Sequence, residues 1–237
     1  MYGKFLWRYC TNRTHVMHLS PRGESNGKCV ILIHGLLHRA IMMRSIGNFL
    51  AGHGYEVFLY DYQTTRMTIP EHGVVLRKFL VNLAKERQNE TFDLIVHSMG
   101  GMISRWAFGN PLADPALTSY RKLLMLGTPN QGSPRADFYL KATPFLEKGI
   151  RSLSGLSAKT NAWSDVPVPE NLVVATLAGK FDRLVSEESS HFPKEVDHIV
   201  LPISHCGMLF SEQVFAQILY FLVHSRLNHA GMSDLPR

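Results

Sequence analysis

The sequence predicts a doubly wound α/β fold built on a mainly parallel sheet. Two observations carry this prediction. Short apolar runs alternate with longer segments of helical periodicity, and every run is too apolar to leave one face in water. A parallel sheet covered on both faces follows. The expected strands cover residues 28–35, 55–62, 92–98, 122–129, 171–179 and 197–204.

Three predicted helices connect or follow these strands. The first, residues 70–88, has Pro70 in its first turn, one apolar face and basic residues near its end. The second covers residues 99–109. The last, residues 211–227, is apolar almost all round, which predicts that it is mostly buried.

Composition favours one domain over residues 1–237. A chain of 237 residues with 45% hydrophobic content can bury a full core. Its longest apolar runs are far shorter than the roughly 18 residues that span a bilayer. The N-terminal residues lack the continuous apolar core of a signal peptide, and three widely spaced cysteines favour reduced thiols. We therefore expect a cytoplasmic protein.

The net charge of +6 favours a lipid surface over nucleic acid as a partner. The 25 Lys and Arg residues are dispersed singly among aliphatic residues and form no dense run. We therefore expect no nucleic-acid partner. An anionic lipid surface suits the same charge better, and the sequence indicates no obligate protein partner.

The alternation breaks once, over residues 130–170. This segment holds four prolines, and it is too irregular for another strand and helix and too apolar for a linker. We expect a small cap inserted over the edge of the sheet. Part of it has an amphipathic, basic pattern that predicts either a packed cap helix or transient contact with lipid. The pattern consists of Phe145, Leu146, Ile150, Leu153 and Leu156 with Lys148, Arg151 and Lys159.

The C-terminal end of the sequence carries less information. The tail after Leu227 is short and polar, and we expect it to be disordered.

The stretch DLIVHSMGGMISRW, residues 93–106, predicts a catalytic serine. A buried strand ends at a serine, and two glycines open the helix that follows. A strand that turns sharply into a helix can hold one side chain exposed above the sheet edge on strained backbone. Ser98 is the residue at that position, and we predict that it is a nucleophile.

A serine nucleophile needs a base and a carboxylate that orients it. Asp182 follows the strand at 171–179, and His205 follows the strand at 197–204, so both lie at the same sheet edge as Ser98. We predict that His205 is the base and Asp182 the acid. Asp165 and Asp197 are weaker candidates because the first precedes its strand and the second begins one.

The negative oxygen of the reaction intermediate needs N–H donors. The backbone amide of Met99, the residue after the nucleophile, is one candidate, and the Leu36 amide in the loop after the first strand is the other. Gly35 allows that loop to approach closely, and His34 braces it. His34 and His38 lack a third ligand nearby, so no metal is expected.

Five segments in register resemble the lipase and esterase branch of the α/β-hydrolase family: LIHGLL, IVHSMGG, LGTPNQGSP, GKFDRLV and ISHCGML. The resemblance runs from about Cys29 to Leu227 and implies an α/β-hydrolase fold acting on acyl chains. Two positions depart from the family pattern. Val96 stands where the G-x-S-x-G pattern has its first glycine, which implies a compensating small neighbour such as Gly100 or Gly101. Asn130 stands where lipases often carry histidine.

Together these features predict a serine hydrolase that cleaves carboxylic esters with an apolar acyl part through an acyl-enzyme. The expected partner is a small-molecule acyl ester, and no cofactor is expected. Thioester hydrolysis and acyl transfer use the same residues and remain alternatives. The alternative of a different class is a binding protein of the same fold without catalysis.

Overall fold

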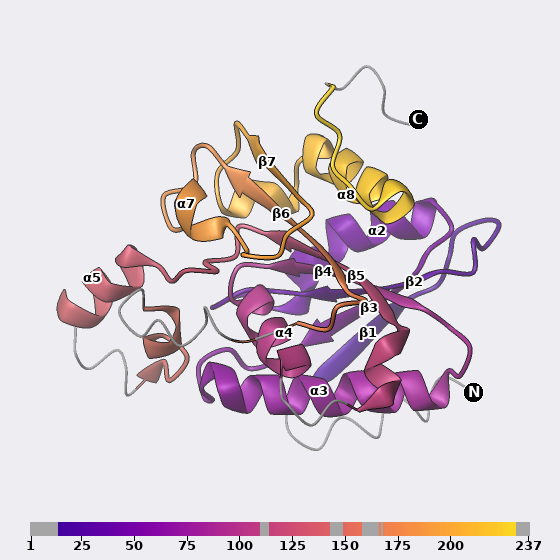
Figure 1. Ribbon diagram of the computed structural model, residues 1–237, viewed down its shortest axis with the longest axis horizontal. Helices are drawn as coiled ribbons and strands as arrows, with labels where there is room; N and C mark the ends of the chain where they lie inside the picture. The colour runs from indigo at the N-terminus through magenta and orange to yellow at the C-terminus, as the bar shows by residue number, and fades with distance from the viewer. Residues whose placement is uncertain (1–13, 110–113, 143–148, 158–165, 167, 231–237) are drawn as a thin grey trace.

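The computed structural model describes residues 14–109, 114–142, 149–157, 166 and 168–230 (Figure 1). Seven strands form one sheet in the order β1-β3-β2-β4-β5-β6-β7, and all of them pair in parallel except β1, which is antiparallel to β3. The prediction of a mainly parallel sheet is confirmed. The strands are β1 His15–Leu19, β2 Cys29–Ile33, β3 Glu56–Asp61, β4 Phe92–His97, β5 Tyr120–Leu126, β6 Val173–Gly179 and β7 Asp197–Leu201.

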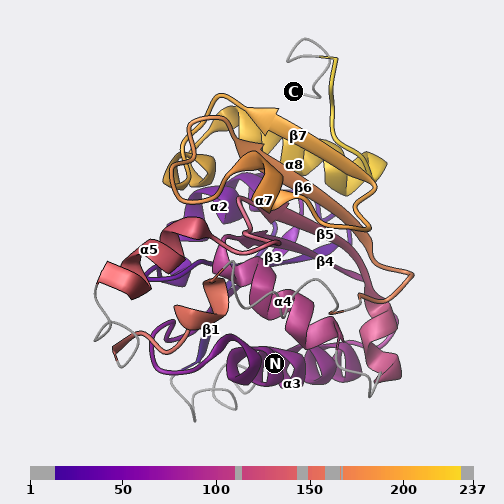
Figure 2. The same ribbon diagram turned by 60° about the vertical axis from the view of Figure 1, so that its left-hand side comes forward.

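Helices cover both faces of this sheet (Figures 1 and 2). The longer ones are α2 Arg44–Gly52, α3 Ile69–Glu86, α4 Met99–Gly109, α5 Pro134–Ala142 and α8 Glu212–His224, and α7 Glu187–Ser190 is a single turn. The described residues also form short 3-10 helices, namely η2 Ala40–Met43, η3 Pro115–Ser119, η4 Ser154–Leu156 and η5 Cys206–Leu209. The predicted helices correspond to α3, α4 and α8, whereas β1, α2 and α5 were not predicted from the sequence.

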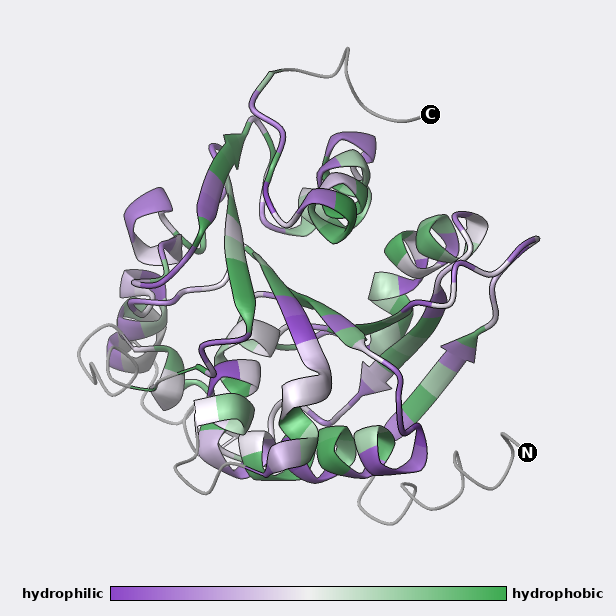
Figure 3. Ribbon diagram, turned by 45° about the vertical axis from the view of Figure 1, so that its right-hand side comes forward, coloured by the Kyte–Doolittle hydropathy of each residue, from purple (hydrophilic) through white to green (hydrophobic). Residues whose placement is uncertain are grey.

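The two faces of the sheet make two separate hydrophobic cores. Along β2, Ile31 and Ile33 pack into the core that α3 and α4 cover, and Val30 and Leu32 pack into the core that α2 and α8 cover. Successive side chains of a strand point to opposite faces. This explains why long stretches of the central strands are apolar and appear green in Figure 3, interrupted by a few hydrophilic residues drawn in purple.

The described part of the expected cap lies beside the carboxyl ends of the strands (Figure 2). Within it, Ser133 and Ser157 form an isolated parallel bridge. Leu153 and Leu156 are buried in the core under α3 and α4, and Arg151 pairs with Glu71 of α3 at 3.2 Å. The described residues 149–157 are therefore packed, and Phe145, Leu146, Lys148 and Lys159 of the amphipathic pattern lie outside the described residues.

The chain is still packed at residues 228–230, past the point where disorder was expected. Asn228 is buried, and its backbone N–H and carbonyl both bond the Gln217 side chain in α8 at 2.8 Å. Residues 231–237 lie outside the described residues. Among the residues that were described, no helix combines the length and apolarity needed to cross a membrane. The cytoplasmic location stays a prediction.

The crossing of α3 and α4 supplies a test of this packing. A Cβ added at Gly73 in α3 would lie 2.3 Å from Trp106 Cδ1 in α4. Gly73→Ala should therefore lower the free energy of unfolding by about 1–3 kcal/mol through overpacking, although alanine favours helices by about 1 kcal/mol. Urea unfolding followed by circular dichroism measures the change.

Gly52→Ala is the matched control, because Gly52 ends α2 with no atom within 4 Å of an added Cβ. It should be neutral or mildly stabilising. Equal effects of the two substitutions would contradict the close approach at Gly73.

Candidate active site

Ser98 lies at the sharp turn between β4 and α4. Its backbone is in the left-handed region, with a φ of 53°, which costs a residue other than glycine about 1–3 kcal/mol. Its N–H donates to the Leu126 carbonyl of β5 at 2.9 Å, and its carbonyl accepts from the Gly101 N–H at 3.0 Å. These bonds hold the strained residue where its side chain meets the cavity at the edge of the sheet.

Two glycines compensate for Val96, which is fully buried in β4. A Cβ added at Gly100 would lie 2.6 Å from the Ile33 carbonyl oxygen, and one at Gly101 would lie 2.2 Å from Thr128 Oγ1. No side chain fits at either position. The start of α4 can therefore approach β2 and the loop after β5 without a glycine at position 96.

Asp182 and His205 reach the same edge from the loops after β6 and β7. His205 Nδ1 lies 2.6 Å from Asp182 Oδ2, and the two side chains are only 8% and 1% exposed. Asp182 Oδ1 accepts from the backbone N–H groups of Leu184 at 2.7 Å and Val185 at 2.9 Å. The loop itself thus orients the carboxylate. Because Nδ1 donates to a carboxylate, Nε2 of His205 carries a free lone pair.

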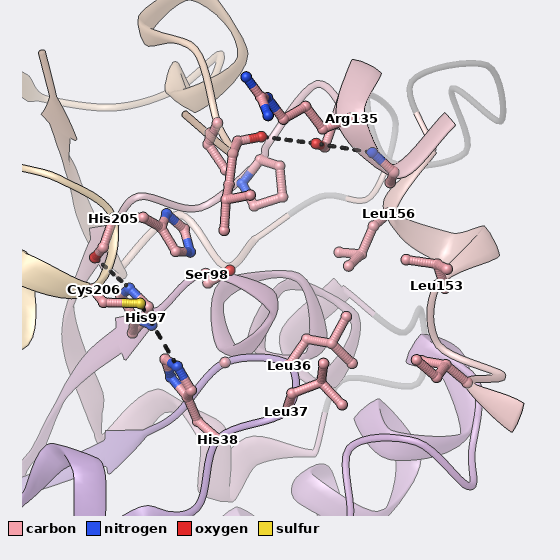
Figure 4. Close-up of a pocket in the computed structure, with 17 residues that line it drawn as sticks. Leu36, Leu37, His38, His97, Ser98, Arg135, Leu153, Leu156, His205 and Cys206 are labelled. Carbon is pink, nitrogen blue, oxygen red and sulfur yellow. Dashed lines mark hydrogen bonds between the residues drawn. The ribbon is translucent and has the colours of Figure 1, made fainter. Parts of the chain in front are cut away.

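The His205 ring points toward Ser98, and His97 supports it from behind (Figure 4). His97 Nε2 donates to the His205 carbonyl at 3.1 Å, and the two ring centroids are 4.6 Å apart. Complete burial, with His205 close by, lowers the pKa of His97 well below its usual range. His97 is therefore a neutral hydrogen-bond donor at pH 7, and it adds no charge beside the His205 imidazole.

Leu36 and Met99, whose backbone amides are the predicted donors, belong to segments next to Ser98. Met99 is the first residue of α4, and Leu36 follows β2 in a loop that touches Ser98. A Cβ added at Gly35 would lie 2.8 Å from Ser98 Cβ. Within the described ranges, neither amide donates to a backbone carbonyl. Both are therefore available to an oxygen that gains negative charge.

A buried polar network braces the loop after β2. His34 Nδ1 lies 3.0 Å from the Gly35 carbonyl. This is the hydrogen bond by which His34 was expected to brace the loop. Asp61, at the end of β3, accepts from Arg39 at 2.6 Å and from the Ala40 N–H at 2.8 Å. Burial alone would raise the pKa of Asp61, but bonds from His34 and Arg39 outweigh it and hold that pKa well below the usual range.

Arg105 of α4 ties the loop after β5 to the helix. It is fully buried, and its Nη1 donates to the Asn130 carbonyl at 2.9 Å and to Asn130 Oδ1 at 3.2 Å. Asn130 Nδ2 in turn donates to the Ser190 carbonyl in α7 at 2.8 Å. Burial lowers the pKa of Arg105 to about 10, so it is still charged at pH 7. Asn130 thus connects α4 to α7 at a position where a histidine is common in lipases.

A cavity of about 410 Å³ opens at Ser98 and His205 (Figure 4). Its other polar side chains are those of His38, His97, Ser133, Arg135 and Cys206. Aliphatic side chains from the loop after β2, the cap and the loop after β6 make most of its wall. Among them are Leu36, Leu37, Ile150, Leu153, Leu156 and Leu184. The cavity can hold an apolar group of moderate size next to Ser98.

The structure brings all the predicted site residues to one edge of the sheet. They are Ser98, Asp182, His205, Leu36 and Met99. The weaker acids are elsewhere: Asp165 lies outside the described residues, and Asp197 accepts from His229 at 2.8 Å and from the Leu227 N–H at 2.7 Å. The supporting residues His97 and Arg105 were not predicted from the sequence.

Two clusters of side chains outside the cavity could share a metal ion. In each, the potential ligand atoms lie within 4.8 Å of one another. Neither cluster contains His34 or His38. The clusters are Glu187 with His191 and His198, and Cys29 with Glu56 and Glu90.

No family model matches the sequence, and no curated protein matches it. Solved structures do match. The mature lipase BlEst2 of Bacillus licheniformis has a TM-score of 0.70 at 15% identity, over 88% of this chain and 96% of the lipase. The carboxylesterase CesB of Bacillus subtilis has a TM-score of 0.59 at 13% identity, over 94% and 95%.

A putative thioesterase from Silicibacter has a TM-score of 0.65 at 13% identity, over 85% of this chain and 78% of the other. The shared arrangement of a mostly parallel seven-stranded sheet with helices on both faces is the α/β-hydrolase fold. At these identities the likeness establishes the fold, and the chain has it.

His72 links pH to the stability of this site, because its ring packs edge-on against Tyr62, which stacks on His34. Burial lowers the pKa of His72 from 6.5 to about 4, so the unfolded chain takes up a proton more readily than the folded one. Its contribution to stability is complete above pH 6.5 and is lost as the pH falls toward 4. When the pH falls from about 7.5 to about 5, protonation of His72 in the unfolded chain should lower the free energy of unfolding by about 2 kcal/mol.

Urea unfolding of His72→Gln at the two pH values measures how much His72 contributes to the pH dependence of the unfolding free energy. The variant should lose about 2 kcal/mol less than the wild type on acidification. His53→Gln, at an exposed position next to α2, is the control and should lose as much as the wild type. If His72→Gln and the wild type lose the same amount, His72 does not titrate in the way described.

Proposed function

We propose that this chain, which has the α/β-hydrolase fold, is a serine hydrolase that cleaves carboxylic esters with an apolar acyl part. The observation that carries the proposal is the 2.6 Å contact between His205 and the buried Asp182 carboxylate, on a histidine that faces a serine in left-handed backbone. A serine hydroxyl alone is a poor nucleophile. A base oriented by a buried carboxylate is what activates it.

The reaction proceeds through an acyl-enzyme. Ser98 Oγ attacks the ester carbonyl carbon while His205 Nε2 takes its proton, and the carbonyl oxygen becomes negative and accepts from the Leu36 and Met99 amides. His205 then gives the proton to the leaving alcohol. Water attacks the remaining acyl-serine with His205 again as base, and the acid leaves. Asp182 stabilises the imidazolium that forms in both halves of the reaction.

The cavity wall supports an apolar acyl group as the part of the substrate held beside Ser98. Aliphatic residues of the cap and the neighbouring loops surround this space, and burying apolar surface contributes about 25 cal/mol per Å². Leu153 and Leu156 line the cavity and are also part of the core. A cap anchored in this way favours short-to-medium acyl chains in a fixed pocket over a lid that swings open.

Thioesters are the second candidate substrate class. A putative thioesterase is among the similar structures, and an acyl thioester would be attacked by the same serine and histidine. Arg135 lines the cavity and offers a positive charge to an anionic thiol part. Comparing turnover of matched acyl esters and acyl thioesters separates the two classes.

Substitution of the three proposed catalytic residues tests the mechanism. Ser98→Ala and His205→Ala should each reduce kcat by about 10⁴-fold or more, and the double variant should be little worse, because the two residues act as a unit. Asp182→Asn should be less severe than either. Hydrolysis of p-nitrophenyl esters measures kcat, and a fluorophosphonate probe measures whether Ser98 reacts.

Asp197→Asn is the matched control for the acid and should keep wild-type kcat. If Asp197→Asn loses activity while Asp182→Asn keeps it, Asp182 is not the catalytic acid. Folded wild-type protein that fails to label at Ser98 would instead support a binding protein without catalysis.

The cavity wall predicts how rates depend on acyl length. Ile150 is half-buried and lines the cavity, so Ile150→Ser should lower kcat/KM for octanoyl esters by about tenfold, equivalent to about 1.4 kcal/mol of lost apolar contact. Acetyl esters should be nearly unaffected. The wild type should show ordinary saturation on soluble esters.

The control for this prediction is Val223→Ser, at an exposed position in α8 that is not part of the cavity wall. It should leave kcat/KM unchanged for both octanoyl and acetyl esters. A sharp rise of wild-type activity at the solubility limit of the substrate, abolished by Ile150→Ser, would contradict the fixed pocket and indicate a cap that opens on lipid.

A further inference from the structure

A second group of titratable side chains lies outside the proposed active site, between α7 and the start of β7. It contains Glu187 of α7, His191 and Glu195 of the loop that follows, and His198 of β7, which pairs with Thr176 of β6. Figures 1 and 2 both show α7 beside β6 and β7. None of the five residues lines the cavity at Ser98.

Hydrogen bonds determine which nitrogen of each imidazole carries the proton. Thr176 has one hydroxyl proton, and it donates that proton to the Glu195 carboxylate, which can only accept. The Thr176 oxygen is also 2.6 Å from His198 Nδ1, so it accepts a proton from that nitrogen. His191 Nδ1 donates to Glu195 Oε1 at 2.5 Å. Both imidazoles are therefore protonated at Nδ1 and carry a lone pair on Nε2.

The two imidazole rings lie close together with the same edge toward Glu195. The rings are 3.9 Å apart between centroids and tilted by 31°, and the Nδ1 edges of both face Glu195, at 2.5 Å and 4.0 Å. The Nε2 edges therefore face away from that carboxylate. Among the residues described, His198 Nε2 is a buried atom with no hydrogen-bond partner. One potential ligand atom from each of Glu187, His191 and His198 lies within 4.8 Å of the others.

We propose that Nε2 of His191, Nε2 of His198 and the carboxylate of Glu187 bind one Zn²⁺ ion. Two imidazoles and one carboxylate are a common zinc ligand set, with water in the fourth position. Ligand atoms about 2.0–2.1 Å from zinc in a tetrahedron are about 3.3–3.5 Å from one another. Glu187 is exposed, so its side chain can rotate to close the remaining gap.

The supporting residues fit this assignment. Metal-binding histidines usually donate their other ring N–H to a carboxylate or another oxygen, which orients the ring. Glu195 and Thr176 supply those acceptors here. The second cluster lacks such a fit, because Arg87 already pairs with Glu56 at 2.6 Å and with Glu90 at 2.9 Å.

A zinc ion at this position would join α7 to β7. The same short helix supplies the Ser190 carbonyl that accepts from Asn130, and it follows the loop of Asp182. The ion would therefore stabilise the loop that carries the proposed acid without touching a reacting atom. Binding can be measured whether or not the chain hydrolyses esters.

Titration of the metal-stripped full chain, without a histidine tag, tests the proposal. Isothermal calorimetry should show saturable binding of one Zn²⁺ per chain. Co²⁺ in its place should give the strong visible absorption of a tetrahedral ion, without the near-ultraviolet band of a thiolate ligand. At about a hundredfold excess over Kd, Zn²⁺ should raise Tm by about 5–10 °C.

Three variants and two controls decide the outcome. His191→Gln, His198→Gln and Glu187→Gln should each weaken Zn²⁺ binding about tenfold or more and remove most of the rise in Tm. His191 and Glu187 are partly or fully exposed, so their variants should fold even if His198→Gln does not. His224→Gln, an exposed histidine of α8, should bind like the wild type.

Cys206→Ser is the second control, because Cys206 Sγ lies 3.9 Å from His38 Nε2 at the cavity and could bind zinc there. Absence of saturable binding in the wild type would overturn the proposal. So would binding that Cys206→Ser abolishes while His191→Gln and Glu187→Gln leave it unchanged.

Discussion

The structure of the site depends on one strained residue, Ser98. Its left-handed backbone turns the chain from β4 into α4 and is opposed by steric repulsion that costs about 1–3 kcal/mol. Three hydrogen bonds offset this cost, from its N–H to Leu126 and to its carbonyl from the Gly101 N–H and the Thr128 hydroxyl. Two of those partners lie in β5 and the loop after it. The strain can persist only because the parallel sheet surrounds it.

Buried charged side chains hold the loops on either side of this turn in place. Arg105 and Asp61 are both buried. Arg105 donates to Asn130 in the loop after β5, and Asp61 accepts from Arg39 and Ala40 in the segment after β2. Leaving one partner of such a group unsatisfied costs more than the bond itself contributes. The loops around the cavity are therefore held to a single arrangement by polar contacts, while the apolar layers beneath them hold the strands.

The sequence predicted the sheet, the turn at Ser98 and the positions of Asp182 and His205 because each depends on local order along the chain. A strand buried on both faces is apolar throughout, and the carboxyl ends of parallel strands share an edge. β1 was missed because its pairing with β3 is not local, and its five residues include two histidines. α2 was missed because Gly47, Gly52 and Asn48 weaken its helical signal.

The polar supports of the site could not be predicted in the same way. A single arginine in a helical pattern indicates a solvated face, and only the fold brings the Asn130 carbonyl to Arg105. His97 looked like the last residue of a strand, and its acceptor is 108 positions away. The cluster of His191 and His198 likewise depends on Thr176 of a neighbouring strand. Such contacts are set by tertiary structure and leave no periodic signal.

The order of the strands has a consequence for how the protein is made. From β2 onward, β4, β5, β6 and β7 are added to one growing side of the sheet in the order in which they occur in the chain. As the chain emerges from the ribosome, each new strand finds its neighbour already present, which keeps exposed edges short-lived. Ser98 is in position early, whereas its two partners arrive with the last two strands. A nascent or truncated chain can thus build most of the sheet and still lack Asp182 and His205, the residues proposed to activate Ser98.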